Sequence, residues 1–195
     1  MMEPLRDLAH SPDGAHGRFN RSDCIYRFCI EETTGERIAM NTNPNPFRIR
    51  AASPADVARI ECIVREAYSP YISRNGATPG PMLDDYPARV AQGVVHVLES
   101  EDGIEGLVVL IPEPDDGCML LDNIAVSPTA QGKGHGRALL QWADDAARRA
   151  GFSRIRLYTQ EVMTENIAIY ARRGYVETHR ATEIGLNRVF MQRPL

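Results

Sequence analysis

The sequence contains one short glycine-rich run, Gln131-Gly132-Lys133-Gly134-His135-Gly136. Three glycines within five positions leave the backbone N–H groups unobstructed, so several of them can point at one anion. An amphipathic helix is predicted directly after the run, and its N-terminus adds positive potential there. The run therefore predicts a binding site for a phosphate or pyrophosphate group.

Two common phosphate-binding motifs do not fit this run. The P-loop requires Gly-x4-Gly-Lys-Ser/Thr, whereas Lys133 is followed by Gly134 and leaves no hydroxyl in place for magnesium. The dinucleotide fingerprint requires Gly-x-Gly-x-x-Gly, and here the third glycine comes one residue early. Lys133 is the only lysine in the chain, but arginine would serve equally beside a phosphate.

Two segments together resemble the signature of the GNAT superfamily of N-acetyltransferases. The first is Gln-x-x-Gly-x-Gly at 131–136, after a strand that ends in Asn-Ile-Ala-Val-Ser-Pro at 123–128. The second, at 166–175, is similar to Asn-x-x-Ala-x-x-Tyr-x-x-x-Gly-Phe/Tyr, with the alanine shifted by one position. The resemblance covers 47–195 and implies acetyl-CoA as co-substrate, with no metal.

The resemblance also implies how acetyl-CoA is held. The backbone of the glycine run would bind the pyrophosphate, and free backbone groups at the end of the 118–126 strand would pair with the pantetheine amides. One of those N–H groups would polarise the thioester carbonyl. Asn166 would contact the cofactor, or else faces solvent on its helix. The expected cofactor-binding residues are Ile124, Ala125, Val126, Gln131, Gly132, Lys133, Gly134, His135, Gly136, Arg137 and Asn166.

Tyr170 is the expected general acid. Attack by an amine expels a thiolate, which needs a proton, and a phenol with a pKa of about 10 is protonated at neutral pH. The alternative is that Tyr170 only packs, because it shares a helical face with Ile167 and Gly174. His96 and His135 are interpreted as structural or solvent-exposed residues.

Asp122 is the first choice for the general base, because it precedes the cofactor-pairing residues on the 118–126 strand. Strand alternation places it on the opposite face from Asn123, which favours the acceptor side. The alternatives are a strand-edge charge paired with an arginine, or a base role for Glu99, Glu113 or a chain of waters.

The acceptor wall is expected in the irregular loop predicted at 68–81 and in the residues after it. Tyr68 and Tyr71 can frame a small molecule, Arg74 can bind a carboxylate, and Asp85 or its neighbour Asp84 an ammonium. Packing of the loop alone is an equally weighted interpretation. A small-molecule amine is the first hypothesis for the acceptor. A lysine or N-terminal amine of a protein, or a catalytically silent acyl-CoA-binding module, are the alternatives.

These residues must be positioned by a mixed α/β domain. Residues after 46 predict the order β-α-α-β-β-β-α-β-α-β-β. The resemblance implies a GNAT-like fold, with a central, mostly antiparallel sheet splayed between two parallel strands and about four flanking helices. Strands are predicted at 47–51, 94–98, 104–111, 118–126, 154–159, 175–178 and 188–192, and helices after Ser53, at 83–91, at 136–150 and after Thr164.

Composition limits the class of protein. A net charge of −4 and a pI near 5.8 argue against a nucleic-acid partner. No apolar run approaches the roughly 20 residues that span a bilayer, and no secretory signal is evident, so a cytoplasmic location without a membrane partner is expected. The four cysteines lack metal-site spacing and are interpreted as reduced thiols. A homodimer is left open.

Residues 1–46 differ from the rest and are expected to be a disordered extension and linker, rich in Pro, Gly, His, Asp and Arg. The segment 24–30 can form one short strand. Met40 lies just before the Thr-Asn-Pro-Asn-Pro linker, and one hypothesis is that translation begins there.

Overall fold

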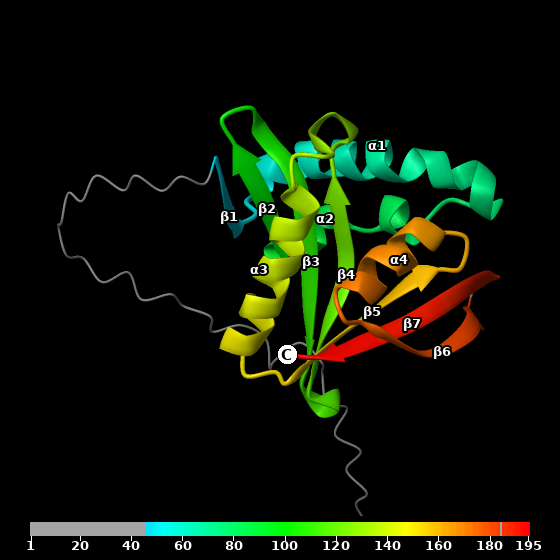
Figure 1. Ribbon diagram of the computed structural model, residues 1–195. Helices are drawn as coiled ribbons and strands as arrows, with labels where there is room; N and C mark the ends of the chain where they lie inside the picture. Colours follow the sequence, from blue (N-terminus) through cyan, green and yellow to red (C-terminus); the bar gives the residue numbers. More distant parts are fainter. Residues whose placement is uncertain (1–45, 184) are drawn as a thin grey trace, which may run out of the picture. The chain divides into compact units, whose positions relative to one another are not determined.

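The computed structural model describes residues 46–183 and 185–195 (Figure 1). The expectations for residues 1–45, including the short strand at 24–30 and the start at Met40, lie outside the described residues. The elements in chain order are β1 (Phe47–Ala51), η1 (Pro54–Asp56), α1 (Val57–Asn75), η2 (Gly80–Leu83), α2 (Tyr86–Ala91), β2 (Val95–Ser100), β3 (Gly103–Glu113), η3 (Pro114–Asp116), β4 (Cys118–Val126), η4 (Pro128–Ala130), α3 (His135–Arg149), β5 (Arg154–Gln160), α4 (Thr164–Arg172), β6 (Val176–Glu183) and β7 (Leu186–Pro194).

The strands form one seven-stranded sheet in the order β1-β2-β3-β4-β5-β7-β6. Every neighbouring pair is antiparallel except β4 and β5, which run parallel and are connected through α3. The predicted mixed α/β architecture, with a mostly antiparallel sheet and four α-helices, is confirmed.

The parallel pair separates halfway along its length. Register between β4 and β5 runs only from Cys118 opposite Arg154 to Leu121 opposite Leu157. Strand β4 continues to Val126 and β5 to Gln160, so their last residues have no strand partner on the facing edges. Figure 1 shows the two strands diverging at this end. The predicted splay of the sheet is therefore present.

A β-bulge on β4 lies where the separation begins. Val109 of β3 is opposite Asn123 and Leu110 is opposite Leu121, so Asp122 is an extra residue without a partner on β3. An extra residue reverses the side-chain alternation of a strand. Leu121 accordingly packs in the cluster that contains α3, whereas Asn123 bonds to residues of α1 and α2 on the other face.

Each face of the sheet has its own apolar core. On one face Leu139, Ala143 and Ala147 of α3 recur at helical spacing and are fully buried against β2, β3, β4 and β5. On the other face Ile60 and Ile63 of α1 pack with α2, β2 and β3. The central strands of the sheet are thereby packed on both faces.

The prediction of an irregular loop at 68–81 is wrong for its first eight residues. Helix α1 continues through Pro70 to Asn75, and its C-cap is Gly76 with φ +66°. A proline inside a helix removes one hydrogen bond and costs about 3 kcal/mol. Beyond Pro70 the helix reaches α4, where Arg74 forms an ion pair with Glu165 at 2.6 Å. Sequence propensity could not anticipate a contact between residues so far apart.

The second helix begins later than predicted, at Tyr86 instead of residue 83. The Asp85 carboxylate accepts a hydrogen bond from the Ala88 N–H at 2.9 Å and so caps the first turn. Pro87 lies in that first turn, where a proline is tolerated because its missing N–H would have had no helical partner.

Within the described residues no helix is long and apolar enough to cross a membrane. Cys62 and Cys118 carry free thiols, while Cys24 and Cys29 lie outside the described part of the chain.

Replacing Leu139 by alanine is expected to lower the free energy of unfolding by about 2–5 kcal/mol, because it leaves a cavity in a fully buried position. Urea unfolding of the full chain measures the change. Val176→Ala is the control, since Val176 is 65% exposed, and a change below about 0.5 kcal/mol is expected there. Equal losses in the two variants would contradict the assignment of the core.

Candidate active site

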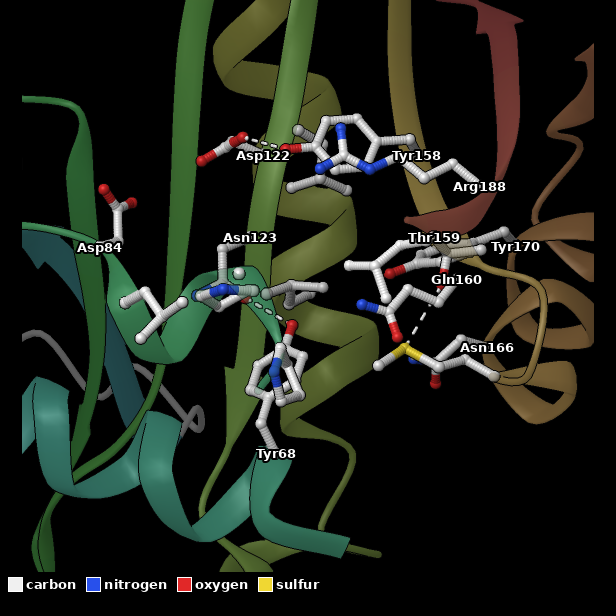
Figure 2. Close-up of a pocket in the computed structure, with 18 of the residues that line it drawn as sticks. Tyr68, Asp84, Asp122, Asn123, Tyr158, Thr159, Gln160, Asn166, Tyr170 and Arg188 are labelled. Atoms are coloured by element: carbon white, nitrogen blue, oxygen red, sulfur yellow. Dashed lines mark hydrogen bonds between the residues drawn. The ribbon is translucent and has the colours of Figure 1, made fainter. Parts of the chain in front are cut away.

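Two cavities open where β4 and β5 separate. The larger, of about 880 Å³, runs along the glycine loop, the free edge of β4 and helix α4. The smaller, of about 270 Å³, lies between β4, β5, β7 and the η2 segment and is drawn in Figure 2. Both cavities share the walls formed by Tyr68, Ile124, Asn166 and Tyr170. A molecule in one cavity therefore lies next to a molecule in the other.

The glycine loop presents its backbone to the larger cavity. Gly132 and Gly134 have φ values of +83° and +86°, a conformation that favours glycine. Helix α3 starts at His135, and no described side chain caps its first turn. The N–H groups of that turn are therefore available to an anion, as a pyrophosphate site requires. The loop residues on the wall are Gln131, Gly132, Gly134, His135, Gly136 and Arg137.

Lys133 points away from that wall and toward the sheet. Its Nζ lies 2.7 Å from the carboxylate of Glu105 on β3, and 3.5 Å from Asp102. The Nε2 of His135 lies 2.9 Å from the other oxygen of Glu105. The Glu105 side chain is 8% exposed, and the hydrogen bond from Lys133 helps lower its pKa to about 2. Glu105 thus fastens the glycine loop to the sheet through two of its residues.

The free edge of β4 forms a second wall of the larger cavity. Ile124, Ala125 and Val126 line it, and they pair with β3 only through their other edge. Their remaining backbone groups can bond an extended ligand as a neighbouring strand would. Asn166 lies at the start of α4 on the boundary of both cavities, with its Nδ2 3.6 Å from the sulfur of Met163.

Tyr170 lies at the junction of the two cavities (Figure 2). Its side chain is held edge-to-face against Tyr175, with ring centroids 5.7 Å apart, and the residue is 9% exposed. Burial raises the pKa of its phenol to about 12. The hydroxyl therefore keeps its proton throughout the neutral range.

Asp122 lines the smaller cavity, and so does Asn123, because the bulge turns both side chains toward it. Strict alternation, which the sequence interpretation assumed, would have separated these two residues. The Tyr158 hydroxyl donates a hydrogen bond to Asp122 at 3.1 Å, and Arg89 lies 3.6 Å away. Burial is the main reason that the pKa of Asp122 is raised above its ordinary value.

The other base candidates lie elsewhere. Glu99 forms ion pairs with Arg48 and Arg50 near the far edge of the sheet. Glu113 pairs with Arg156 at the opposite end of β4 from the splay. Among the described residues, neither glutamate lines either cavity.

A chain of buried hydrogen bonds holds Tyr68 at the junction. The Tyr86 hydroxyl donates to the carbonyl of Pro81 at 3.0 Å, and Asn123 donates to that hydroxyl at 2.9 Å. The Tyr68 hydroxyl in turn donates to the Asn123 Oδ1 at 2.7 Å. Tyr86 and Asn123 are 2% and 4% exposed. This chain connects η2, β4 and α1, and the bulge at Asp122 is what brings Asn123 into it.

The remaining acceptor candidates, Tyr71, Arg74 and Asp85, do not line the smaller cavity. Tyr71 lies on the larger cavity, and its hydroxyl donates to Glu165 at 3.2 Å. Arg74 is paired with the same carboxylate and with the Val162 carbonyl. Asp85 caps α2, and it is its neighbour Asp84 that lies on the smaller cavity.

The sequence interpretation missed several polar residues of the smaller cavity, among them Arg89, Tyr158, Gln160 and Arg188. Alternation along β5 puts Tyr158 and Gln160 on one side of the strand, and this was the only available signal. Arg188 comes from β7, which pairs with β5 across a long sequence separation. The residues around Arg188 in the sequence do not indicate that pairing.

Replacing Glu105 by glutamine is expected to weaken coenzyme A binding about tenfold, because Lys133 and His135 lose the carboxylate that fixes the loop. Calorimetric titration with coenzyme A measures the change. Asp102→Asn is the control, since Asp102 is 77% exposed and lies farther from Lys133. Unchanged affinity in Glu105→Gln would contradict the anchoring role.

The contacts of Glu105 also contribute to the stability of the folded protein in a pH-dependent way. The pKa of Glu105 is lowered to about 2 in the folded protein. The stabilisation from the ionised carboxylate is therefore present above the unfolded pKa, about 4.3, and is lost as the pH falls toward 2.

The part of the chain that contains the walls of these two cavities is similar to known proteins. Residues 91–177 match the acetyltransferase (GNAT) domain family. Mycothiol acetyltransferase of Jonesia denitrificans is 32% identical over 87 residues, which are 45% of this chain and 28% of that protein. The uncharacterized N-acetyltransferase YesJ of Bacillus subtilis is 28% identical over 113 residues, 52% of this chain and 63% of that protein. The chain thus spans less than two thirds of either relative.

A solved structure extends the match over the described domain. YncA of Salmonella typhimurium, solved with its cofactor acetyl-CoA, superposes with a TM-score of 0.59 at 25% identity, over 77% of this chain and 94% of YncA. The matched family segment contains the β4 edge, the glycine loop and helix α4. Residues 91–177 therefore match the GNAT acetyltransferase domain, and the described domain shares its fold with an acetyltransferase solved with acetyl-CoA.

Proposed function

We propose that this protein transfers the acetyl group of acetyl-CoA to a small-molecule amine, by direct attack in a ternary complex, and that residues 47–195 form the catalytic domain. The observation that carries the proposal is the meeting of two cavities at Tyr170, Ile124 and Asn166. Such an arrangement holds donor and acceptor together, and orientation alone supplies a large part of the rate. YncA, which has a similar fold, was solved with its cofactor acetyl-CoA.

The larger cavity is the proposed donor site. Backbone N–H groups from Gly132 to Arg137 bind the pyrophosphate, together with the uncapped N-terminus of α3. The free β4 edge at Ile124–Val126 pairs with the extended arm of the cofactor and offers an N–H to the carbonyl oxygen as charge develops there. Bound acetyl-CoA supplies the activated thioester.

Tyr170 is proposed as the general acid, since its hydroxyl lies on the wall shared by both cavities. The raised pKa, about 12, keeps the proton in place at neutral pH. It also makes the phenol a weaker acid, so the hydroxyl stabilises the developing thiolate by a hydrogen bond while the proton moves.

Asp122 is proposed as the general base that accepts the proton of the amine. A free alkylammonium has a pKa of about 10, so a carboxylate whose pKa is raised is better matched to it than an ordinary one. Arg89, Tyr158, Asp84 and Arg188 are the charged or titratable groups that surround it. They hold the carboxylate in place and set its proton affinity.

A small-molecule acceptor is favoured over a protein by the acceptor cavity itself. Its volume is about 270 Å³, and side chains from β4, β5, β7 and η2 surround it. A protein substrate would need an open groove for several residues on either side of the amine.

Release of thiol from acetyl-CoA, measured over a panel of small amines and of peptides with free lysine or N-terminal amines, tests this proposal. Turnover with small amines is the expected outcome. Tight acetyl-CoA binding without thiol release for any acceptor would indicate a silent binding module, and turnover with peptides alone would indicate a protein acetyltransferase.

Tyr170→Phe is expected to lower kcat by about 10²-fold or more, because it removes the proton donor and keeps the ring packed against Tyr175. Affinity for acetyl-CoA, measured by calorimetry, is expected to stay close to that of the wild type. Tyr175→Phe is a matched control, because Tyr175 is also buried and adjacent but lines neither cavity within the described residues. Unchanged kcat in Tyr170→Phe would exclude Tyr170 from the mechanism.

Asp122→Asn is expected to lower kcat/KM about 10²-fold near neutral pH. The ratio of wild-type to variant kcat/KM should fall toward one as the pH drops through the raised pKa of Asp122, because a protonated carboxyl no longer acts as a base. The ratio cancels the titration of the amine substrate. Glu113→Gln serves as control, and a pH-independent ratio would argue against Asp122 as the base.

A further inference from the structure

The acceptor cavity carries charges of both signs. Four charged side chains line it, two carboxylates and two guanidinium groups, namely Asp84, Asp122, Arg89 and Arg188. Arg89 already bridges the two acids, with its Nε 3.1 Å from Asp84 and its Nη2 3.6 Å from Asp122. The two carboxylates therefore share one arginine, and the ion pair of Arg188 is with Glu183 instead.

Arg188 is held in place but not fully used. Its guanidinium lies 4.4 Å from the centre of the Tyr158 ring, which fixes its plane. Its Nη1 pairs with Glu183 at 2.6 Å, and that glutamate is 44% exposed. Within the described residues, Arg188 makes no other side-chain hydrogen bond. The Arg188 side chain itself is only 19% exposed, so an anion bound inside the cavity can compete with the more exposed Glu183 for the guanidinium.

Gln160 stands directly opposite Arg188 in the β5–β7 register and also lines the cavity. Its Oε1 is buried and has no hydrogen-bond partner among the described residues. A buried amide without a partner costs free energy unless a ligand supplies one. The Gln160 Oε1, an acceptor without a described partner, thus lies beside Arg188, whose guanidinium has further N–H donors free among the described residues.

We infer that the acceptor is an amine that also carries a carboxylate close to its nitrogen, with Arg188 binding the carboxylate and Gln160 Oε1 accepting a hydrogen bond from the amine. The inference rests on the proposed function. Figure 2 shows Arg188, Tyr158 and Asp122 gathered at one end of the pocket, and Tyr170 and Asn166 toward the other. A molecule bound by Arg188 can therefore extend its amine toward Tyr170.

Charge considerations favour this class over a simple amine. The wall holds two guanidinium groups as well as two carboxylates, and an amine without an anionic group would leave Arg188 without a ligand partner. A zwitterion brings its own anion to Arg188, and an arginine–carboxylate contact is among the stronger and more directional hydrogen-bonded pairs. A volume of about 270 Å³ accommodates a molecule the size of an amino acid.

The test measures thiol release from acetyl-CoA with the common α-amino acids, each paired with its own carboxamide, which has the same amine but no carboxylate. For the amino acid that is acetylated best, kcat/KM is expected to exceed that of its carboxamide about tenfold or more. In Arg188→Gln the ratio of the two kcat/KM values is expected to collapse to about one. Arg188→Lys should restore part of it, because a lysine keeps the charge without the fork geometry.

Arg180→Gln is the matched control, since Arg180 lies on the neighbouring strand β6, is 51% exposed and pairs with Glu177 and Glu161. It should keep the wild-type preference for the carboxylate, and thermal unfolding of each variant checks that it is folded. Equal turnover of acids and carboxamides by the wild type, or turnover only of amines without a carboxylate, would overturn the inference and leave the proposed acetyl transfer intact. No turnover with any amine would overturn both.

Discussion

The separation of β4 from β5 is the constraint on which the rest of this site depends. Four residue pairs hold the two strands together, from Cys118 to Leu121, and then the strands part. The N–H and carbonyl groups on the parted edges need water or a ligand as partner, because a buried N–H or carbonyl without one is costly. The free β4 edge is thus a built-in binding surface, and both cavities are its consequence.

The bulge at Asp122 determines what stands on each side of that gap. By reversing the alternation it turns Asn123 toward α1 and α2, where the chain of hydrogen bonds through Tyr86 and Tyr68 begins. It also places Asp122 on the acceptor cavity beside Tyr158. One extra residue in a strand therefore positions the proposed base and, through Tyr68, the boundary between the two cavities.

Two side chains of the glycine loop hold the loop in position. Lys133 and His135 both contact Glu105, so they fasten the loop to β3. The proposed anion-binding groups are the backbone N–H groups of the loop and the start of α3, which do not move independently of the helix. In the acceptor cavity, by contrast, the side chains of Asp122, Arg89 and Arg188 carry the charges, and the proposed class of acceptor rests on them.

The sequence alone determined the order of the elements, the glycine loop and the candidate acid Tyr170, since these follow from local periodicity and from two short motifs. It could not show that Lys133 turns to Glu105, that α1 continues through Pro70, or that Asp85 caps a helix while Asp84 lines the cavity. Arg188 and Gln160 meet only because β7 pairs with β5. Contacts of this kind join residues that are distant in the chain, and no local pattern of residue types encodes them. The tertiary structure therefore determines which residues line the acceptor cavity, whereas the sequence alone determines the glycine-rich motif of the donor site.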